Sequence, residues 1–119
     1  MQDFRQLGVW QKAHRLVLDL YRATRLFPKE ELYGLTSQIR RCSASVPANV
    51  AEGCGRGSDP DFARFLQLAM GSASELEYHL LLAHDLGYLK DTDAQRLTEA
   101  TIEVKRMLTS LIRRLQGKR

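Results

Sequence analysis

The longest regular pattern in the sequence is a helical repeat of apolar and small side chains between residues 62 and 87. Its members are Phe62, Phe65, Ala69, Ala73, Leu76, Leu80, Ala83 and Gly87. Steps of three and four residues place such side chains on one face of a helix. A helix from Pro60 to Gly87 would be roughly 40 Å long at about 1.5 Å per residue. The preceding Ser58 is a suitable N-cap, and Gly87 is suited to the C-terminal end.

Two further stretches show the same spacing. Between Leu7 and Arg25 the apolar or small stripe consists of Trp10, Ala13, Val17, Leu20 and Thr24. Phe27-Pro28 ends this helix, because a residue before proline is pushed out of the α region. Thr92 and Gln95 have the spacing of a capping box that opens the last helix. The stripe of that helix consists of Leu97, Thr101, Val104, Leu108, Leu111 and Leu115.

The second helix contains a proline, which leaves two outcomes open. We expect this helix to start near residues 29–32 and to end at Gly53. Its apolar stripe consists of Leu32, Leu35, Ile39, Cys42, Val46 and Val50. Pro47 removes one backbone hydrogen bond and clashes with the carbonyl at Ser43, so the helix either kinks and continues or breaks and restarts with Ser45 as its cap. The apolar spacing persists through Val50, which favours a kinked, continuous helix.

No stretch alternates with period two over a useful length, so no strand is expected. Four long helices with short loops predict an all-α fold, an antiparallel up-down-up-down four-helix bundle. With 119 residues, the whole chain (1–119) forms a single domain that can build a core without disulfides or metal.

The two cysteines and the hydropathy indicate a cellular setting. Cys42 is expected to be a small core residue and Cys54 a loop residue, both reduced; a redox role is the less favoured alternative. No apolar run approaches the roughly 20 residues that span a bilayer. The first residues lack the basic and apolar regions of a signal peptide. We therefore expect a cytoplasmic protein without membrane contact.

Basic residues cluster in two parts of a chain whose net charge is +4 and whose pI is near 9.3. The C-terminal run contains no acidic residue and consists of Lys105, Arg106, Arg113, Arg114, Lys118 and Arg119. Arg40, Arg41 and Arg56 form the second group around the second helix. Such clusters suit a polyanionic partner. Cations that complement the dipole at a helix C-terminus are an equally weighted alternative.

Candidate catalytic and metal-binding residues are sparse. Di-iron bundles use Glu-x-x-His pairs, and none occurs here. Glu75 and His79 are four residues apart, a spacing more typical of a surface contact than of a metal site. Glu52, at a helix end, is expected to pair with Arg56 as a structural brace. We expect no enzyme activity, no bound metal and no cofactor.

Several apolar residues lie off the predicted core stripes. They are Leu16, Tyr21, Leu68, Met70, Leu81, Leu82, Leu86, Ile102 and Ile112. Surplus apolar faces often bury against other subunits, so we expect self-association. A thick monomer core is the alternative.

Three motifs resemble one bacterial family. The first motif consists of VWQ and QIRR, before residue 42. The second consists of PANVAEG and GR, up to Arg56. The third consists of GS, ELE and LGYL, between Phe62 and Leu89. From about Phe4 to Leu115 the chain resembles the four-helix bundle proteins encoded by intervening sequences of 23S rRNA genes. This family is similar to the accessory protein of diversity-generating retroelements, a basic pentamer that engages nucleic acid and a reverse transcriptase. The resemblance implies a bundle, a homopentamer, and association with RNA or DNA.

The leading hypothesis is a non-enzymatic oligomer that associates with nucleic acid, RNA rather than DNA. Its arginines would contact phosphates without base specificity. The candidate residues are Arg40, Arg41, Arg56, Arg113 and Arg114. The alternative is a scaffold that docks a partner protein on its apolar surface.

Overall fold

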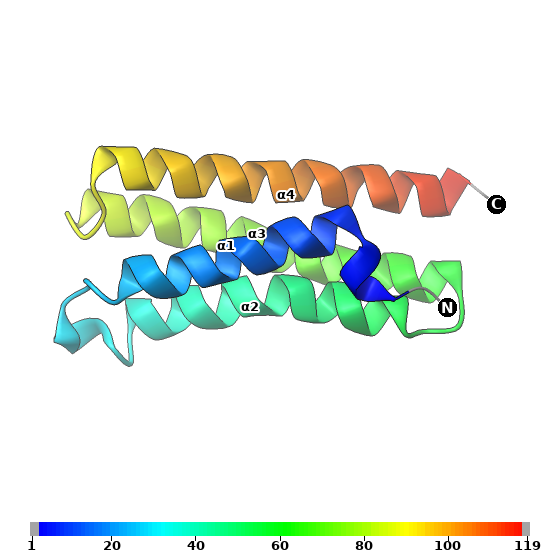
Figure 1. Ribbon diagram of the computed structural model, residues 1–119, viewed down its shortest axis with the longest axis horizontal. Helices are drawn as coiled ribbons and strands as arrows, with labels where there is room; N and C mark the ends of the chain where they lie inside the picture. Colours follow the sequence, from blue (N-terminus) through cyan, green and yellow to red (C-terminus); the bar gives the residue numbers. More distant parts are fainter. Residues whose placement is uncertain (1–2, 118–119) are drawn as a thin grey trace.

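The computed structural model describes residues 3–117, which form a bundle of four long helices (Figure 1). The long helices are α1 (Gly8–Thr24), α2 (Leu35–Cys54), α3 (Asp59–Asp85) and α4 (Asp91–Gly117). Two short 3-10 helices precede α1 and α2: η1 (Phe4–Gln6) and η2 (Lys29–Glu31). No strand occurs among these described residues. The predicted all-α fold class is confirmed.

The four helices pack around the long axis of a rod that measures 47 × 22 × 20 Å. Figure 1 shows the loops at alternate ends of the rod, so that the chain reverses direction from each helix to the next. α2 and α4 each pack against both α1 and α3. The first and third helices therefore lie diagonally opposite one another.

Most of the core consists of the stripes that the apolar spacing predicted, but Leu66 joins it without having been predicted, and the placement of Leu32 in the core was wrong, because this side chain is 49% exposed. The largest fully buried side chains include Leu20, Ile39, Leu66, Leu76, Leu80, Leu97 and Leu108. Thr101 is the polar member of the α4 stripe; its hydroxyl donates to the carbonyl of Leu97 at 2.8 Å, which satisfies it inside the core. Leu16 and Ile112 are also buried. For these two residues the thick-core alternative is correct, and the expectation of a surplus outer face is wrong.

The second helix runs through Pro47 without a break. This confirms the continuous helix and excludes the restart at Ser45, while the bend itself stays a prediction. The helix also includes Cys54, which is buried. The expectation that Cys54 is a loop residue is therefore wrong.

The start of α2 differs from the prediction, because residues 29–31 form the short η2 and the α-helix begins only at Leu35. The cause lies in Glu31. One carboxylate oxygen, Oε1, accepts from the backbone N–H of Leu35 at 3.0 Å and so satisfies a donor of the first turn. The other, Oε2, accepts from the hydroxyl of Tyr88 at 2.9 Å. These bonds lower the pKa of Glu31.

The ends of α3 match their predicted signals. Ser58 Oγ accepts from the backbone N–H of Asp61 at 3.3 Å. At the other end Gly87 adopts a φ of 82°, and the N–H of Tyr88 donates to the carbonyl of Ala83 at 2.9 Å. This is a Schellman motif, whose left-handed residue favours glycine.

The predicted capping box of α4 is wrong. The helix already includes Asp91, so Thr92 lies inside it rather than at its cap. The Gln95 side chain turns forward and donates to Glu99 at 3.1 Å. Among residues 3–117, no helix is long and apolar enough to cross a membrane.

Candidate nucleic-acid interface

The five candidate arginines, predicted in two groups, differ in their surroundings. Arg40 is turned toward the end of α1. Its Nε donates to Thr24 Oγ1 at 2.9 Å, and its Nη2 donates to the carbonyl of Tyr21 at 3.3 Å. Its guanidinium also lies over the Tyr21 ring, 4.6 Å from the centroid. Carbonyls in the last turn of a helix lack partners within the helix. Arg40 therefore supports the C-terminal turn of α1, which engages two of its five N–H donors and fixes the direction of its guanidinium.

Arg56 is also engaged within the molecule, at the loop between α2 and α3. Its Nε donates to Asp61 Oδ2 at 3.0 Å, and its guanidinium lies 4.9 Å from the centroid of Phe65. Glu52 is 4.0 Å away, which confirms the expected brace. Arg64 donates to the other Asp61 oxygen at 3.1 Å. Hydrogen bonds from both arginines lower the pKa of Asp61.

Arg41, Arg113 and Arg114 face solvent. Within the described range none of the three makes an ion pair or a side-chain hydrogen bond. Arg41 lies in the first half of α2, whereas Arg113 and Arg114 lie near the end of α4, at the same end of the rod as the α2–α3 loop (Figure 1). Lys118 and Arg119, predicted to extend the α4 cluster, lie outside the described residues.

A shallow groove between α3 and α4 collects part of the C-terminal basic run. Its volume is about 520 Å³, and we call it the basic groove. It is lined by Met70, Glu77, Ile102, Lys105, Arg106, Thr109, Ser110 and Arg113. Arg106 and Arg113 are seven residues apart and so share a helix face, about 10 Å from one another along the axis. Lys105 is partly neutralised, because its Nζ lies 2.9 Å from Glu77 Oε1.

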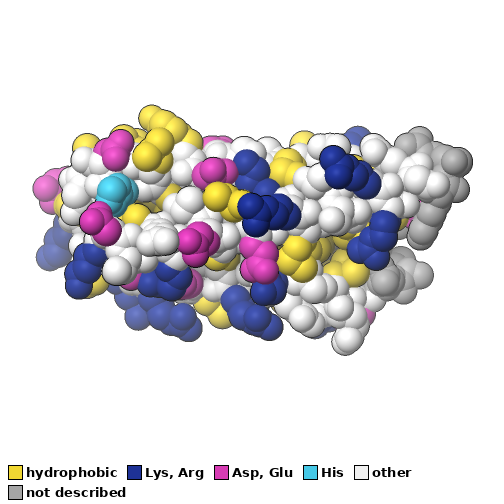
Figure 2. Space-filling model, turned by 90° about the horizontal axis from the view of Figure 1, so that it is seen from above, with side chains coloured by type: hydrophobic (Ala, Val, Ile, Leu, Met, Phe, Trp, Pro, Cys, Tyr) yellow, Lys and Arg dark blue, Asp and Glu magenta, His cyan; other side chains and the backbone are white. Residues whose placement is uncertain are grey.

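A basic stripe on α1 was not anticipated. Arg15 and Arg22 in α1 and Arg25 just after it are exposed, and none has an ion-pair partner among residues 3–117. Their spacing of seven and three residues puts them on one face. This spacing of the three arginines is visible in the sequence, where it runs alongside the apolar stripe of α1. Figure 2 shows basic side chains spread along the length of the visible face, with acidic side chains between many of them.

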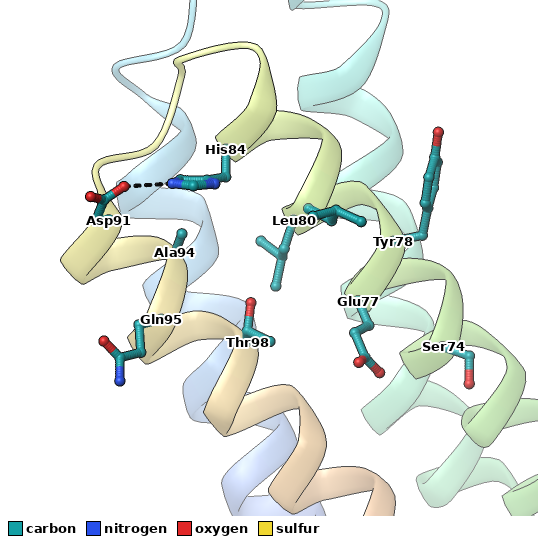
Figure 3. A pocket seen from close by; sticks show the side chains of 10 residues that line it. Ser74, Glu77, Tyr78, Leu80, His84, Asp91, Ala94, Gln95 and Thr98 are labelled. Atoms are coloured by element: carbon teal, nitrogen blue, oxygen red, sulfur yellow. Dashed lines mark hydrogen bonds and ion pairs between the residues drawn. The ribbon is translucent and has the colours of Figure 1, made fainter.

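A second groove between α3 and α4 lies nearer the loop that joins them (Figure 3). Its volume is about 630 Å³, and we call it the apolar groove. It is lined by Ser74, Glu77, Tyr78, Leu80, Leu81, His84, Asp91, Ala94, Gln95 and Thr98. Tyr78 and Leu81 are 58% and 56% exposed, although both are large and apolar. At the end of the groove His84 Nε2 lies 2.6 Å from Asp91 Oδ1, a hydrogen bond that raises the pKa of His84.

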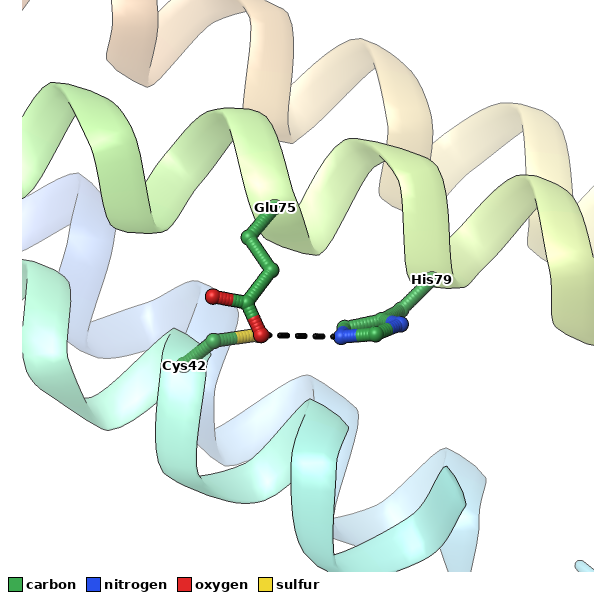
Figure 4. A group of neighbouring side chains, drawn as sticks. All are labelled: Cys42, Glu75 and His79. Carbon is green, nitrogen blue, oxygen red and sulfur yellow. Dashed lines mark hydrogen bonds and ion pairs between the residues drawn. The ribbon is translucent and has the colours of Figure 1, made fainter.

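Cys42, Glu75 and His79 converge between α2 and α3 (Figure 4). One ligand atom from each lies within 4.8 Å of the other two. The pair Glu75 and His79 was recognised in the sequence, and their contact of 3.0 Å is present. No sequence pattern indicated that Cys42 joins this pair, because its distance from Glu75 and His79 depends on the register of α2 against α3. Burial and the Glu75 carboxylate raise the pKa of the Cys42 thiol to about 12.

Fold and surface together define a four-helix bundle with exposed arginines and an apolar groove. Residues 5–110 match the model of the 23S rRNA-intervening sequence protein family, so the chain belongs to that family. The motif resemblance is thereby confirmed. No curated protein matches the chain.

A solved structure has the same fold. It is the 1.70 Å crystal structure of a protein of unknown function from the S23 ribosomal protein family of Bacteroides thetaiotaomicron. The match has a TM-score of 0.81 and 24% identity, and it covers 88% of this chain and 95% of the other. This likeness supports the bundle architecture.

Proposed function

We propose that this protein binds nucleic acid, preferentially RNA, through exposed arginines that contact phosphates without reading bases. The observation that carries the proposal is the basic groove, where Arg106 and Arg113 share one face of α4 and have no carboxylate partner in the described chain. Membership of the 23S rRNA-intervening sequence protein family supports RNA as the polyanion.

The chemistry of the basic groove suits a phosphate backbone rather than a base edge. Arginine donates in a planar fork that matches phosphate oxygens. Ser110 lines the same groove and adds a hydroxyl donor, whereas the Thr109 hydroxyl already donates to the Lys105 carbonyl at 3.0 Å. The groove lacks an aromatic lining residue on which a base could stack. Contacts of this kind give affinity that depends on salt and is shared by all sequences.

The predicted arginines differ in what they can contribute. Arg113, Arg114 and Arg41 are exposed and free of intramolecular partners in residues 3–117, so they form the proposed contact set together with Arg106. Arg40 and Arg56 are held by hydrogen bonds within the molecule. We therefore assign these two a supporting role.

The test is binding of the purified protein to labelled ribosomal RNA fragments between roughly 50 and 300 mM salt, with DNA of the same sequence alongside. The double variant Arg106→Ala/Arg113→Ala should bind all RNA sequences more weakly and should show a shallower salt dependence, by about one unit of slope per lost phosphate contact. Unchanged binding in this variant would contradict the assignment to the basic groove. Absence of RNA binding by the wild type at the lowest salt would refute the function.

The matched control is Lys29→Ala/Lys90→Ala. This variant removes the same two positive charges from exposed residues with no ion pair in the described part of the chain. Both residues lie at the far end of the rod, near η2 and the α3–α4 loop (Figure 1). The control variant Lys29→Ala/Lys90→Ala should bind RNA nearly as well as the wild type.

We also propose that the protein self-associates, as a homopentamer, through the apolar groove. Tyr78 and Leu81 are more than half exposed there, and Leu86 nearby is 50% exposed. Large apolar side chains at such exposure favour a protein interface. The homopentamer itself comes from the family resemblance. Several copies of one modest basic groove would then bind the same RNA with increased avidity.

The molar mass from light scattering after size-exclusion chromatography tests this second proposal. Leu81→Glu should lower the mass and weaken RNA binding, whereas Leu26→Glu, at an 86% exposed residue outside the groove, should leave the mass unchanged. A wild-type monomer would contradict self-association. If the monomeric wild type bound another protein and the Leu81→Glu variant did not, the scaffold alternative would replace the proposal of self-association.

A further inference from the structure

We propose that Cys42, Glu75 and His79 bind one divalent cation of the zinc class between α2 and α3. The fourth ligand position would open to the adjoining groove. Thiolate, imidazole and carboxylate are the ligands that Zn²⁺ takes in proteins, and three protein ligands with one open position are the arrangement of its catalytic rather than its structural sites. This inference is independent of nucleic-acid binding.

The backbone brings the three side chains together for identifiable reasons. Glu75 and His79 are four residues apart on α3 and so project from the same face. Cys42 faces them from α2 (Figure 4). One turn further along, Ser45 Oγ and Ser72 Oγ are 2.9 Å apart, so small side chains let the two helices approach closely. This close approach carries the Cys42 sulfur toward the Glu75 carboxylate.

The donor atoms are near the arrangement that a tetrahedral cation requires. With metal–ligand bonds of about 2.0–2.3 Å, donors in such a site lie roughly 3.3–3.8 Å apart. Here the three atoms lie within 4.8 Å of one another, and His79 Nε2 is already 3.0 Å from Glu75 Oε2. Cys42 and His79 are buried and held by packing. Glu75 has an exposed side chain, so rotation about its side-chain bonds can bring the three donor atoms to the spacing that the metal requires.

The burial of His79 supports a ligand role. The residue is only 8% exposed, and one nitrogen, Nε2, points at Glu75, while Nδ1 has no hydrogen-bond partner among residues 3–117. Coordination through Nε2 would give this buried imidazole a stronger interaction than its hydrogen bond to Glu75 alone.

The surroundings allow a cation to enter. Cys42 and Glu75 line a groove of about 470 Å³ that also contains Ser37, Gln38 and Ser45. Solvent therefore reaches the cluster from one side. Once the metal has displaced the thiol proton, thiolate and carboxylate together would carry two negative charges, which match a divalent cation. Arg41 also lines this groove and favours an anion or water, rather than another cation, at the fourth position.

The test uses the full-length protein after treatment with a chelator. Titration with Co²⁺, which occupies zinc sites and absorbs visible light, should saturate at one equivalent. It should also show thiolate-to-cobalt charge transfer in the near ultraviolet. Added Zn²⁺ should remove this absorption and raise the melting temperature. Cys42→Ser should abolish the charge-transfer band, and His79→Gln should weaken binding about tenfold or more.

Cys54→Ser is the matched control, because it removes the other thiol and should keep the band. Circular dichroism of each variant checks folding. Glu75→Gln changes an exposed side chain, so it tests the site even if a variant at a buried position does not fold. It should weaken Co²⁺ binding and reduce the rise in melting temperature with Zn²⁺. A wild type without the band and without a Zn²⁺-dependent rise, or a band that survives in Cys42→Ser, would overturn the proposal.

Discussion

The ion pair between Lys105 Nζ and Glu77 Oε1, at 2.9 Å, lies where the two grooves of the α3–α4 face meet. Glu77 lines both the apolar groove and the basic groove, and Lys105 lines the basic one. The side chains are about one third exposed. The pair therefore separates the surface proposed for other copies of the chain from the surface proposed for RNA, and it leaves Lys105 less available to a phosphate.

Glu77→Gln should strengthen RNA binding at low salt. The substitution removes a negative charge from the edge of the basic groove and releases Lys105 for a phosphate. Stability should change by only about 0–1 kcal/mol, because the pair is partly exposed and screened. Affinity measured across a salt series provides the check. Glu30→Gln makes the same charge change at an exposed residue on η2, far from the groove, and should have little effect.

Gly53→Ala should destabilise the bundle by about 1–3 kcal/mol through overpacking. A Cβ at Gly53 would lie 2.8 Å from Phe65 Cβ and 2.9 Å from Phe62 Cδ1, so α2 and α3 would have to separate. Gly71→Ala is the matched comparison, because nothing lies within 4 Å of its added Cβ. At that exposed site in α3, alanine should stabilise by roughly 0.5–1 kcal/mol. Urea denaturation of both variants would reveal the opposite signs, and equal effects would contradict this account.

The helices could be predicted because each one buries a stripe whose spacing is visible in the sequence. Their ends were harder to place. The start of α2 depends on the Glu31 carboxylate reaching Leu35 four residues later, while Tyr88 holds it from the α3–α4 loop. A contact between residues 57 positions apart leaves no local signal. Propensity alone therefore placed the helix start too early.

The candidate sites were predictable only as far as charge and spacing decide them. Net basicity and the α4 run were visible, but no pattern in the sequence tells which of two neighbouring arginines on α2 contacts α1. The same limit applies to the cluster at Cys42. Its distance from Glu75 is set by the register between two packed helices, and apolar periodicity does not specify that register.

The pKa of His84 should lie above its usual value and should fall in Asp91→Asn. The main cause is the hydrogen bond to Asp91, with smaller electrostatic contributions from Asp91 and Asp85. A pKa raised by folding stabilises the protein below the unfolded value of about 6.5, and this contribution is lost as the pH rises through the folded value. Two-dimensional NMR titration of the imidazole gives the pKa directly. An unchanged pKa in Asp91→Asn would contradict the assigned cause.

Arg40 and Arg41 are adjacent on α2, and alanine at each should have opposite consequences. Arg40→Ala removes the donors to Thr24 Oγ1 and the Tyr21 carbonyl, so it should destabilise the fold by roughly 1–3 kcal/mol. RNA affinity, measured well below the melting temperature, should change little.

Arg41→Ala should leave the melting temperature nearly unchanged, because its side chain is exposed and has no partner among the described residues. It should instead weaken RNA binding and reduce the salt dependence. Both variants lose one positive charge, so net charge alone predicts equal losses of RNA affinity. Equal losses would therefore contradict the separate roles assigned to Arg40 and Arg41.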